Sequence, residues 1–140
     1  MLNLAFGWIW ITAGFVSGAM LGMGFHKENF MGGYGSWERR LARLGHIAFF
    51  GTGFLNVLFG LTQGYMGHDA SIFTFTSVSW LFIVGGVSMP ICCFIAARNK
   101  ELKSIFAIPV IALTLGGILI AMTFLYMLIM GGIFSVIMES

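Results

Sequence analysis

The stretch SWERRLARLGHIAFFGTGFLNVLFGLTQ, residues 36–63, joins a charged beginning to a long apolar run. As a helix, Ser36 to Gly64 would measure about 42 Å at the α-helical rise per residue. That length exceeds the roughly 30 Å hydrocarbon core of a bilayer. The first two turns are therefore expected to lie at the membrane interface, and the rest of the helix is expected to cross the membrane.

A projection of this helix separates two faces. Polar groups in hydrocarbon need partners, so the face that carries polar and small residues is expected to point into protein. The opposite face is expected to contact lipid, and it carries Leu44, Ile47, Leu55, Leu58 and Thr62. The face expected to pack inside protein carries Ala42, His46, Phe49, Gly53, Asn56, Gly60 and Gln63.

The whole chain has the composition of a membrane protein. Its 140 residues are 59% hydrophobic and 9% charged, with a mean hydropathy of +0.96, which leaves too little polar surface for a water-soluble globule. Apolar segments at about 4–25, 43–65, 72–97 and 105–130 reach the length of a spanning helix. These segments use most of residues 1–140, which are expected to form a single membrane domain. The predicted fold is an all-α, four-transmembrane-helix up-and-down bundle without a soluble catalytic domain.

The basic residues predict the orientation of the bundle. All seven lie in the first and third connections, within residues 26–43 and 98–104, which the positive-inside rule places in the cytoplasm. Both termini and residues 64–71, which contain no Lys or Arg, then face the other side, so the prediction is N-out/C-out in a bacterial inner membrane. Residues 1–5 carry no charge, which favours a retained first helix over a cleaved signal peptide. The net charge of +2 reflects topology and does not indicate nucleic-acid binding.

The first apolar segment carries Gly14, Gly18 and Gly22 at four-residue spacing. This spacing places the glycines near one face of a helix, where small residues let a neighbouring helix approach closely. Helix packing is therefore their expected role. Trp8 and Trp10, near the start of the segment, are expected to lie in the aromatic belt at the outer membrane interface.

The third apolar segment contains Pro90 in its interior. Proline lacks an amide hydrogen, so the Gly86 carbonyl is expected to lose its usual helical donor and the helix is expected to kink. Such a carbonyl could form part of a pocket, but a kink without a ligand is the favoured interpretation. Cys92 and Cys93 follow, and we expect both to serve as small apolar fillers. Hydroxyl side chains concentrate near the outer end of the segment at Thr74, Thr76, Ser77 and Ser79.

No sequence motif predicts a stand-alone enzyme or a metal site. HExxH, CxxC and Gly-x-Ser-x-Gly patterns are absent from the sequence, and the acidic residues lie in connections or near the termini. The centres of the four apolar segments carry no Asp, Glu, Lys or Arg. An ion pathway would be expected to contain such a residue.

His46 and His26 are the pair that could bind a cofactor. Antiparallel first and second helices would bring both near the cytoplasmic interface, and facing histidines can ligate a b-type haem. Arg39, Arg40 and Arg43 would lie where haem propionates need cations, and His46 alone could ligate a chlorophyll-type pigment. The favoured alternative is that His46 hydrogen-bonds a neighbouring helix and His26 ends its own helix among the headgroups.

Three functions remain open from the sequence. The first is an accessory, non-catalytic integral membrane subunit of a larger inner-membrane complex of respiratory or photosynthetic electron transfer, because the bundle has more small-residue packing faces than four helices can satisfy. The second is a haem- or pigment-binding electron-transfer protein that uses His46 with or without His26. The third is a small oligomeric channel or transporter lined by Asn56, Gln63 and the Pro90 kink.

Overall fold

A computed structural model describes the backbone of residues 1–66 and 72–139 and the side chains of residues 1–66 and 74–131. Within these ranges every regular element is helical. Residues 67–71, most of the second connection, lie outside the description. Four helices are long and apolar enough to cross a membrane, which confirms the predicted fold class at this level. They are α1 (Leu2–Phe25), α2 (Trp37–Met66), α3 (Ile72–Arg98) and α4 (Ala107–Glu139), with short 3₁₀ segments η1 (Phe30–Gly32) and η2 (Lys100–Phe106) in the connections.

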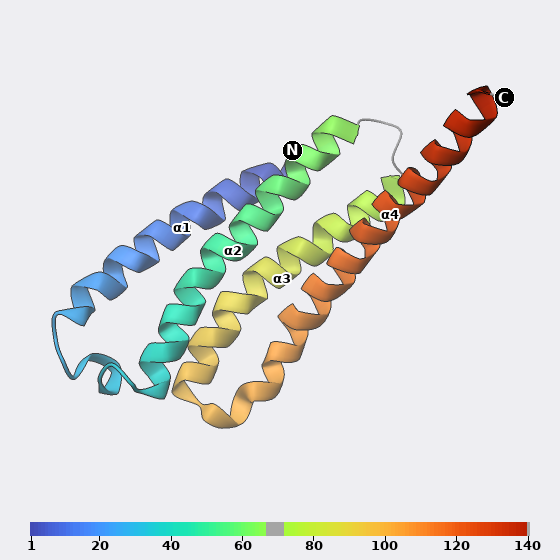
Figure 1. The fold of residues 1–140 in the computed structure, drawn as a ribbon. Helices are drawn as coiled ribbons and strands as arrows, with labels where there is room; N and C mark the ends of the chain where they lie inside the picture. Colours follow the sequence, from blue (N-terminus) through green and yellow to red (C-terminus); the bar gives the residue numbers. More distant parts are fainter. Residues whose placement is uncertain (67–71, 140) are drawn as a thin grey trace.

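The four helices run alternately up and down and lie side by side in chain order (Figure 1). Helix α1 packs on α2, α2 packs on α3, and α3 packs on α4. Among the described residues no comparable packing joins α1 to α4, so the bundle is an open row with α1 and α4 at its edges. The inner helices α2 and α3 are accordingly more buried than the edge helices.

Both described connections lie at the same end of the row, opposite the N terminus (Figure 1). We call this the charged end and define it as residues 26–43 and 98–106, which contain every Lys and Arg of the chain. Trp37 ties α2 to α3 there, because its indole Nε1 donates a hydrogen bond of 2.8 Å to the Ala96 carbonyl oxygen. Small side chains permit this close approach, since Ala42, Cys93 and Ala96 are fully buried.

Aromatic side chains fill the other half of the row. Phe59 of α2 stacks on Phe75 and meets Phe82 edge-on, with ring centroids 5.8 and 5.2 Å apart. Val78 completes this buried cluster, and Met127 of α4 packs against it. Met127 is therefore level with the first turns of α3.

Helix α4 continues beyond this level. The fourth span was expected to end near residue 130, but the helix runs through two consecutive glycines to Glu139. We call residues 128–138 the α4 extension; it adds about 16 Å at the α-helical rise. It passes the beginning of α3 (Figure 1), and its sequence LIMGGIFSVIM carries no charge.

Candidate functional site

A buried polar network joins the three helices α1, α2 and α3. Asn3 and Asn56 are fully buried, and the Asn3 Nδ2 donates a hydrogen bond of 2.8 Å to the Asn56 Oδ1. The Ser79 hydroxyl donates to the Asn3 Oδ1. The Asn56 Nδ2 donates to the carbonyl oxygens of Thr52 and Phe82, at 2.8 and 3.2 Å. Each polar atom of the two amides has a protein partner, so the network locks the helices together and satisfies the buried groups internally.

The carbonyl released by Pro90 also has a donor within the protein. The Trp10 indole Nε1 donates a hydrogen bond of 3.0 Å to the Gly86 carbonyl oxygen. Trp10 is half-buried between Phe6 and Phe49, so its indole faces α3 inside the row. The reason is that a buried carbonyl without a helical donor needs a partner, and the indole supplies one across the α1–α3 boundary.

Glycines allow the close contact of α1 with α2. A Cβ atom added to Gly60 would lie 2.8 Å from the Leu4 backbone nitrogen, and one added to Gly53 would lie 3.1 Å from the Gly7 carbonyl oxygen. Both glycines are buried. The backbones therefore meet where these residues lack a side chain. Gln63 is half-buried farther along α2.

The glycines of α1 meet side chains of α2 over part of their length. An added Cβ at Gly14 would lie 3.0 Å from the Phe50 ring, and one at Gly18 would lie 2.6 Å from the His46 Cε1. A Cβ at Gly22 would meet no atom within 4 Å. The close approach therefore ends at Gly18, and Gly22 is solvent- or lipid-exposed.

His46 is held by its neighbours on α1 and α2. Its Nδ1 lies 3.0 Å from the Ser17 hydroxyl oxygen, within hydrogen-bonding distance. The ring meets Phe50 edge-on, with centroids 5.3 Å apart, and covers Gly18. These contacts give the imidazole a partner on a neighbouring helix and a packed face.

The structure does not bring His26 and His46 together. His46 meets α1 at Ser17 and Gly18, whereas exposed His26 follows the end of α1. Gly18 and His26 are separated by about 12 Å at the α-helical rise. The two imidazoles therefore do not face each other as axial ligands of one haem would.

The three arginines in the first turns of α2 have different surroundings. Arg39 is buried, and its guanidinium carbon lies 4.2 Å from the Phe25 ring centroid. The guanidinium of Arg43 lies 4.6 Å from the Tyr34 ring centroid and donates to the Tyr34 carbonyl oxygen at 3.3 Å. Arg40 is exposed. Arg39 and Arg43 thus hold the first connection against α2, while Arg40 faces the surroundings.

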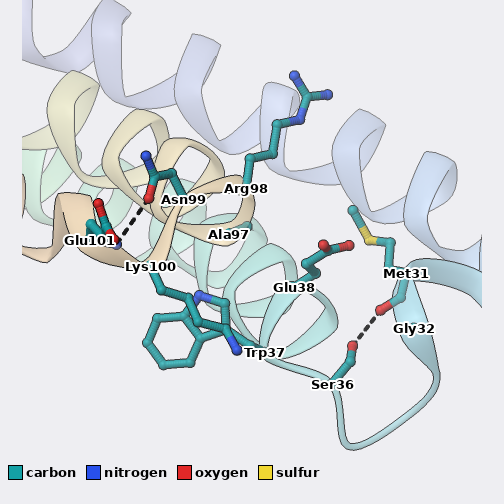
Figure 2. Close-up of a pocket in the computed structure, with 10 residues that line it drawn as sticks. All are labelled: Met31, Gly32, Ser36, Trp37, Glu38, Ala97, Arg98, Asn99, Lys100 and Glu101. Carbon is teal, nitrogen blue, oxygen red and sulfur yellow. Dashed lines mark hydrogen bonds between the residues drawn. The ribbon is translucent and has the colours of Figure 1, made fainter.

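Two adjoining cavities open at the charged end. The polar cavity, of about 620 Å³, lies between the first connection, the beginning of α2 and the turn from α3 into η2 (Figure 2). The apolar cavity, of about 530 Å³, adjoins it along α3, where Ile91, Phe94 and Ile95 line its wall. Both cavities are lined by Met31, Glu38, Ala97, Arg98 and Asn99.

Sequence reasoning missed Asn3 and the inward position of Trp10. The first span was expected to begin at about residue 4, so Asn3 was not considered as a packing residue. A helical projection extended by one residue would have found it, because Asn3, Gly7, Gly14 and Gly18 recur along one face of α1.

Comparisons with protein-family models, with curated proteins and with solved structures find no match to this chain. Among the described residues, no group of three or more His, Cys, Asp or Glu side chains could hold a metal ion. Function is therefore inferred from the packing and the surfaces of the four helices.

Proposed function

We propose that the chain is an accessory, non-catalytic integral membrane subunit of a larger complex, and that the α4 extension contacts another subunit. The observation that carries this proposal is the length of α4. Residues 107–138 carry no charge and measure about 48 Å at the α-helical rise, against the roughly 30 Å hydrocarbon core of a bilayer.

An apolar helix segment that extends beyond the hydrocarbon core of the bilayer needs another apolar surface to shield it from water. Large apolar side chains each lose about 1.5–3 kcal/mol when they pass from an apolar environment into water. Leu128, Ile129 and Met130 are already exposed at the start of the α4 extension. Tilting α4 alone cannot submerge the extension, because α4 is packed along α3 as far as Met127. A membrane subunit beside the α4 extension would bury Leu128, Ile129 and Met130.

The interior of the row supports a role in contact rather than in catalysis or transport. The buried amides of Asn3 and Asn56 are satisfied by the protein itself, and the Gly86 carbonyl is satisfied by Trp10. The open edges of the row leave α1 and α4 free for lateral association. The charged end supports a cytoplasmic location of both described connections in a bacterial inner membrane.

Photo-crosslinking in native membranes tests the proposal. A photo-activatable phenylalanine analogue would replace Leu128, which is 74% exposed on the α4 extension, and in a control it would replace Met20, which is 63% exposed on α1. We expect Leu128 to yield an adduct with a different membrane protein and Met20 to yield little of that adduct. Lipid adducts alone at Leu128, or an adduct with a second copy of the chain, would overturn the proposal. The partner identified by this adduct also tests whether the complex belongs to respiratory or photosynthetic electron transfer.

A further inference from the structure

The two cavities at the charged end share five lining residues but differ in chemistry. The polar cavity carries the charged side chains Glu38, Arg98, Lys100 and Glu101. Lys100 and Glu101 do not line the apolar cavity. Branched and aromatic side chains of α3 form its wall instead. A ligand that fills both cavities must therefore have a charged part and an apolar part.

We propose that the two cavities together bind one phospholipid with a phosphoethanolamine headgroup. The phosphate contacts Arg98, the ammonium group contacts Glu38, and the beginning of an acyl chain lies against Ile91 and Phe94. This site is independent of the contact proposed for the α4 extension, which lies at the opposite end of the row.

The charges at the mouth of the cavities favour a headgroup that is both cationic and anionic. Glu38 and Arg98 line both cavities, and both side chains are exposed. Figure 2 shows Glu38 next to Met31, with the Arg98 side chain extending away from both. Each of the two charges is thus free to meet an opposite charge on one ligand.

Lys100 does not compete with Arg98 for the phosphate. Its Nζ lies 6.0 Å from the Trp37 ring centroid, on the far side of the polar cavity from Met31 (Figure 2). Arg98 remains as the cation on the side that joins the apolar cavity. A guanidinium group suits a phosphate because it can donate two parallel hydrogen bonds.

The depth of the apolar wall matches an acyl chain. Ile91 precedes Arg98 by about 10 Å at the α-helical rise, which exceeds the roughly 5–7 Å of interfacial thickness per leaflet. When Arg98 lies among the headgroups, Ile91 therefore lies in hydrocarbon. Ile91, Phe94 and Ile95 are all partly exposed, so the wall is open to a lipid from the side.

Headgroup selectivity of the full chain tests the proposal. The delipidated protein in detergent would be mixed with equal amounts of dioleoyl phosphatidylethanolamine, phosphatidylcholine and phosphatidylglycerol, and retained lipid would be measured by native mass spectrometry. We expect one retained phosphatidylethanolamine, because the methylated ammonium of phosphatidylcholine cannot donate a hydrogen bond to a carboxylate and phosphatidylglycerol has no cation. Equal retention of the three lipids by the unmodified chain, or a preference for phosphatidylglycerol, would overturn the proposal.

Matched variants localise the selectivity. Glu38→Gln and Arg98→Gln are each expected to lower the preference for phosphatidylethanolamine by roughly 2- to 5-fold, the range for one exposed ion pair. Glu28→Gln and Arg40→Gln change exposed charges at the same end but line neither cavity, so they are expected to preserve the preference. The proposed site would be contradicted if Glu38→Gln kept the full preference for phosphatidylethanolamine. It would also be contradicted if both control variants lost as much of this preference as Glu38→Gln and Arg98→Gln.

A soluble competitor tests the role of the acyl chain. Glycerophosphoethanolamine has the same headgroup and no acyl chain, so at the same concentration it is expected to leave lipid retention unchanged. Displacement of the lipid by this competitor would show that the polar cavity alone binds the headgroup and would overturn the two-cavity proposal.

Discussion

Replacing Trp10 by Phe removes the donor that satisfies the Gly86 carbonyl while it keeps an aromatic ring between Phe6 and Phe49. Hydrogen bonds between membrane helices contribute about 0.6 kcal/mol on average and reach about 1.7 kcal/mol. The hydrogen bond from Trp10 to the Gly86 carbonyl belongs at the upper end of this range, because Pro90 has already removed the helical donor of that carbonyl. With the packing lost on going from Trp to Phe, we expect Trp10→Phe to lower the free energy of unfolding by about 1–3 kcal/mol.

A second substitution separates the hydrogen bond from the packing. In Pro90→Ala the backbone amide at position 90 can donate to the Gly86 carbonyl oxygen. Trp10→Phe should then lower the free energy of unfolding less in the Pro90→Ala background than in the natural sequence. The difference should be about 1 kcal/mol, the contribution of the hydrogen bond. Reversible unfolding in mixed detergent micelles, read by pulse proteolysis, measures all four members of this cycle.

Trp8→Phe is the matched control, because Trp8 lies on the same helix and is 58% exposed. Its effect should stay within about 0.5 kcal/mol. The assigned role of Trp10 would be refuted by equal costs for Trp8→Phe and Trp10→Phe, or by the same cost of Trp10→Phe in both backgrounds.

Three further predictions address the α1–α2 contact, the histidine and the arginines. Gly60→Ala should destabilise the protein by about 1–3 kcal/mol because its Cβ meets backbone, whereas Gly51→Ala, whose Cβ meets nothing within 4 Å, should be neutral or stabilising; unfolding in mixed micelles compares them. Absorption spectra of the purified protein should lack a Soret band in both redox states, and a Soret band that disappears in His46→Ala would contradict the packing role of this residue. Arg39→Gln should lower the free energy of unfolding by about 0.5–2 kcal/mol, because the aromatic contact of Arg39 is lost. Arg40→Gln, at an exposed position, should change the free energy of unfolding by less than about 0.5 kcal/mol.

Hydropathy and helical projection predicted the helical architecture because they depend on local properties. Apolar length identified the four helices, and the projection of α2 separated exposed Ile47 and Leu58 from buried Asn56. The loss of a helical donor at Gly86 also follows from Pro90 alone. These features need no knowledge of which helices become neighbours.

The pairing of helices could not be predicted in the same way. In a membrane, apolar side chains that face lipid and those that face another helix have the same hydropathy, so the open row and the inward position of Trp10 leave no signal in the composition. The glycines at 131 and 132 would favour a helix end in water, since glycine lowers helix stability by about 1 kcal/mol. Helix α4 nevertheless continues past them.

The candidate site was predicted only in part. His46 was singled out as the residue nearest to a cofactor role, and the structure places it against Ser17 and Gly18. The cavities at the charged end depend on the first connection folding over α2 and on the turn from α3 into η2. Neither path is set by a motif, so the sequence could not show that Glu38 and Arg98 line the same cavities.

The central proposal is that this chain works as a subunit of a larger complex, and isolation from its native membrane tests it most directly. The tagged chain would be solubilised in a mild detergent, separated on a native gel and analysed by mass spectrometry. The proposal predicts stoichiometric co-purification of larger integral membrane subunits. A monodisperse species that contains copies of this chain alone would contradict it.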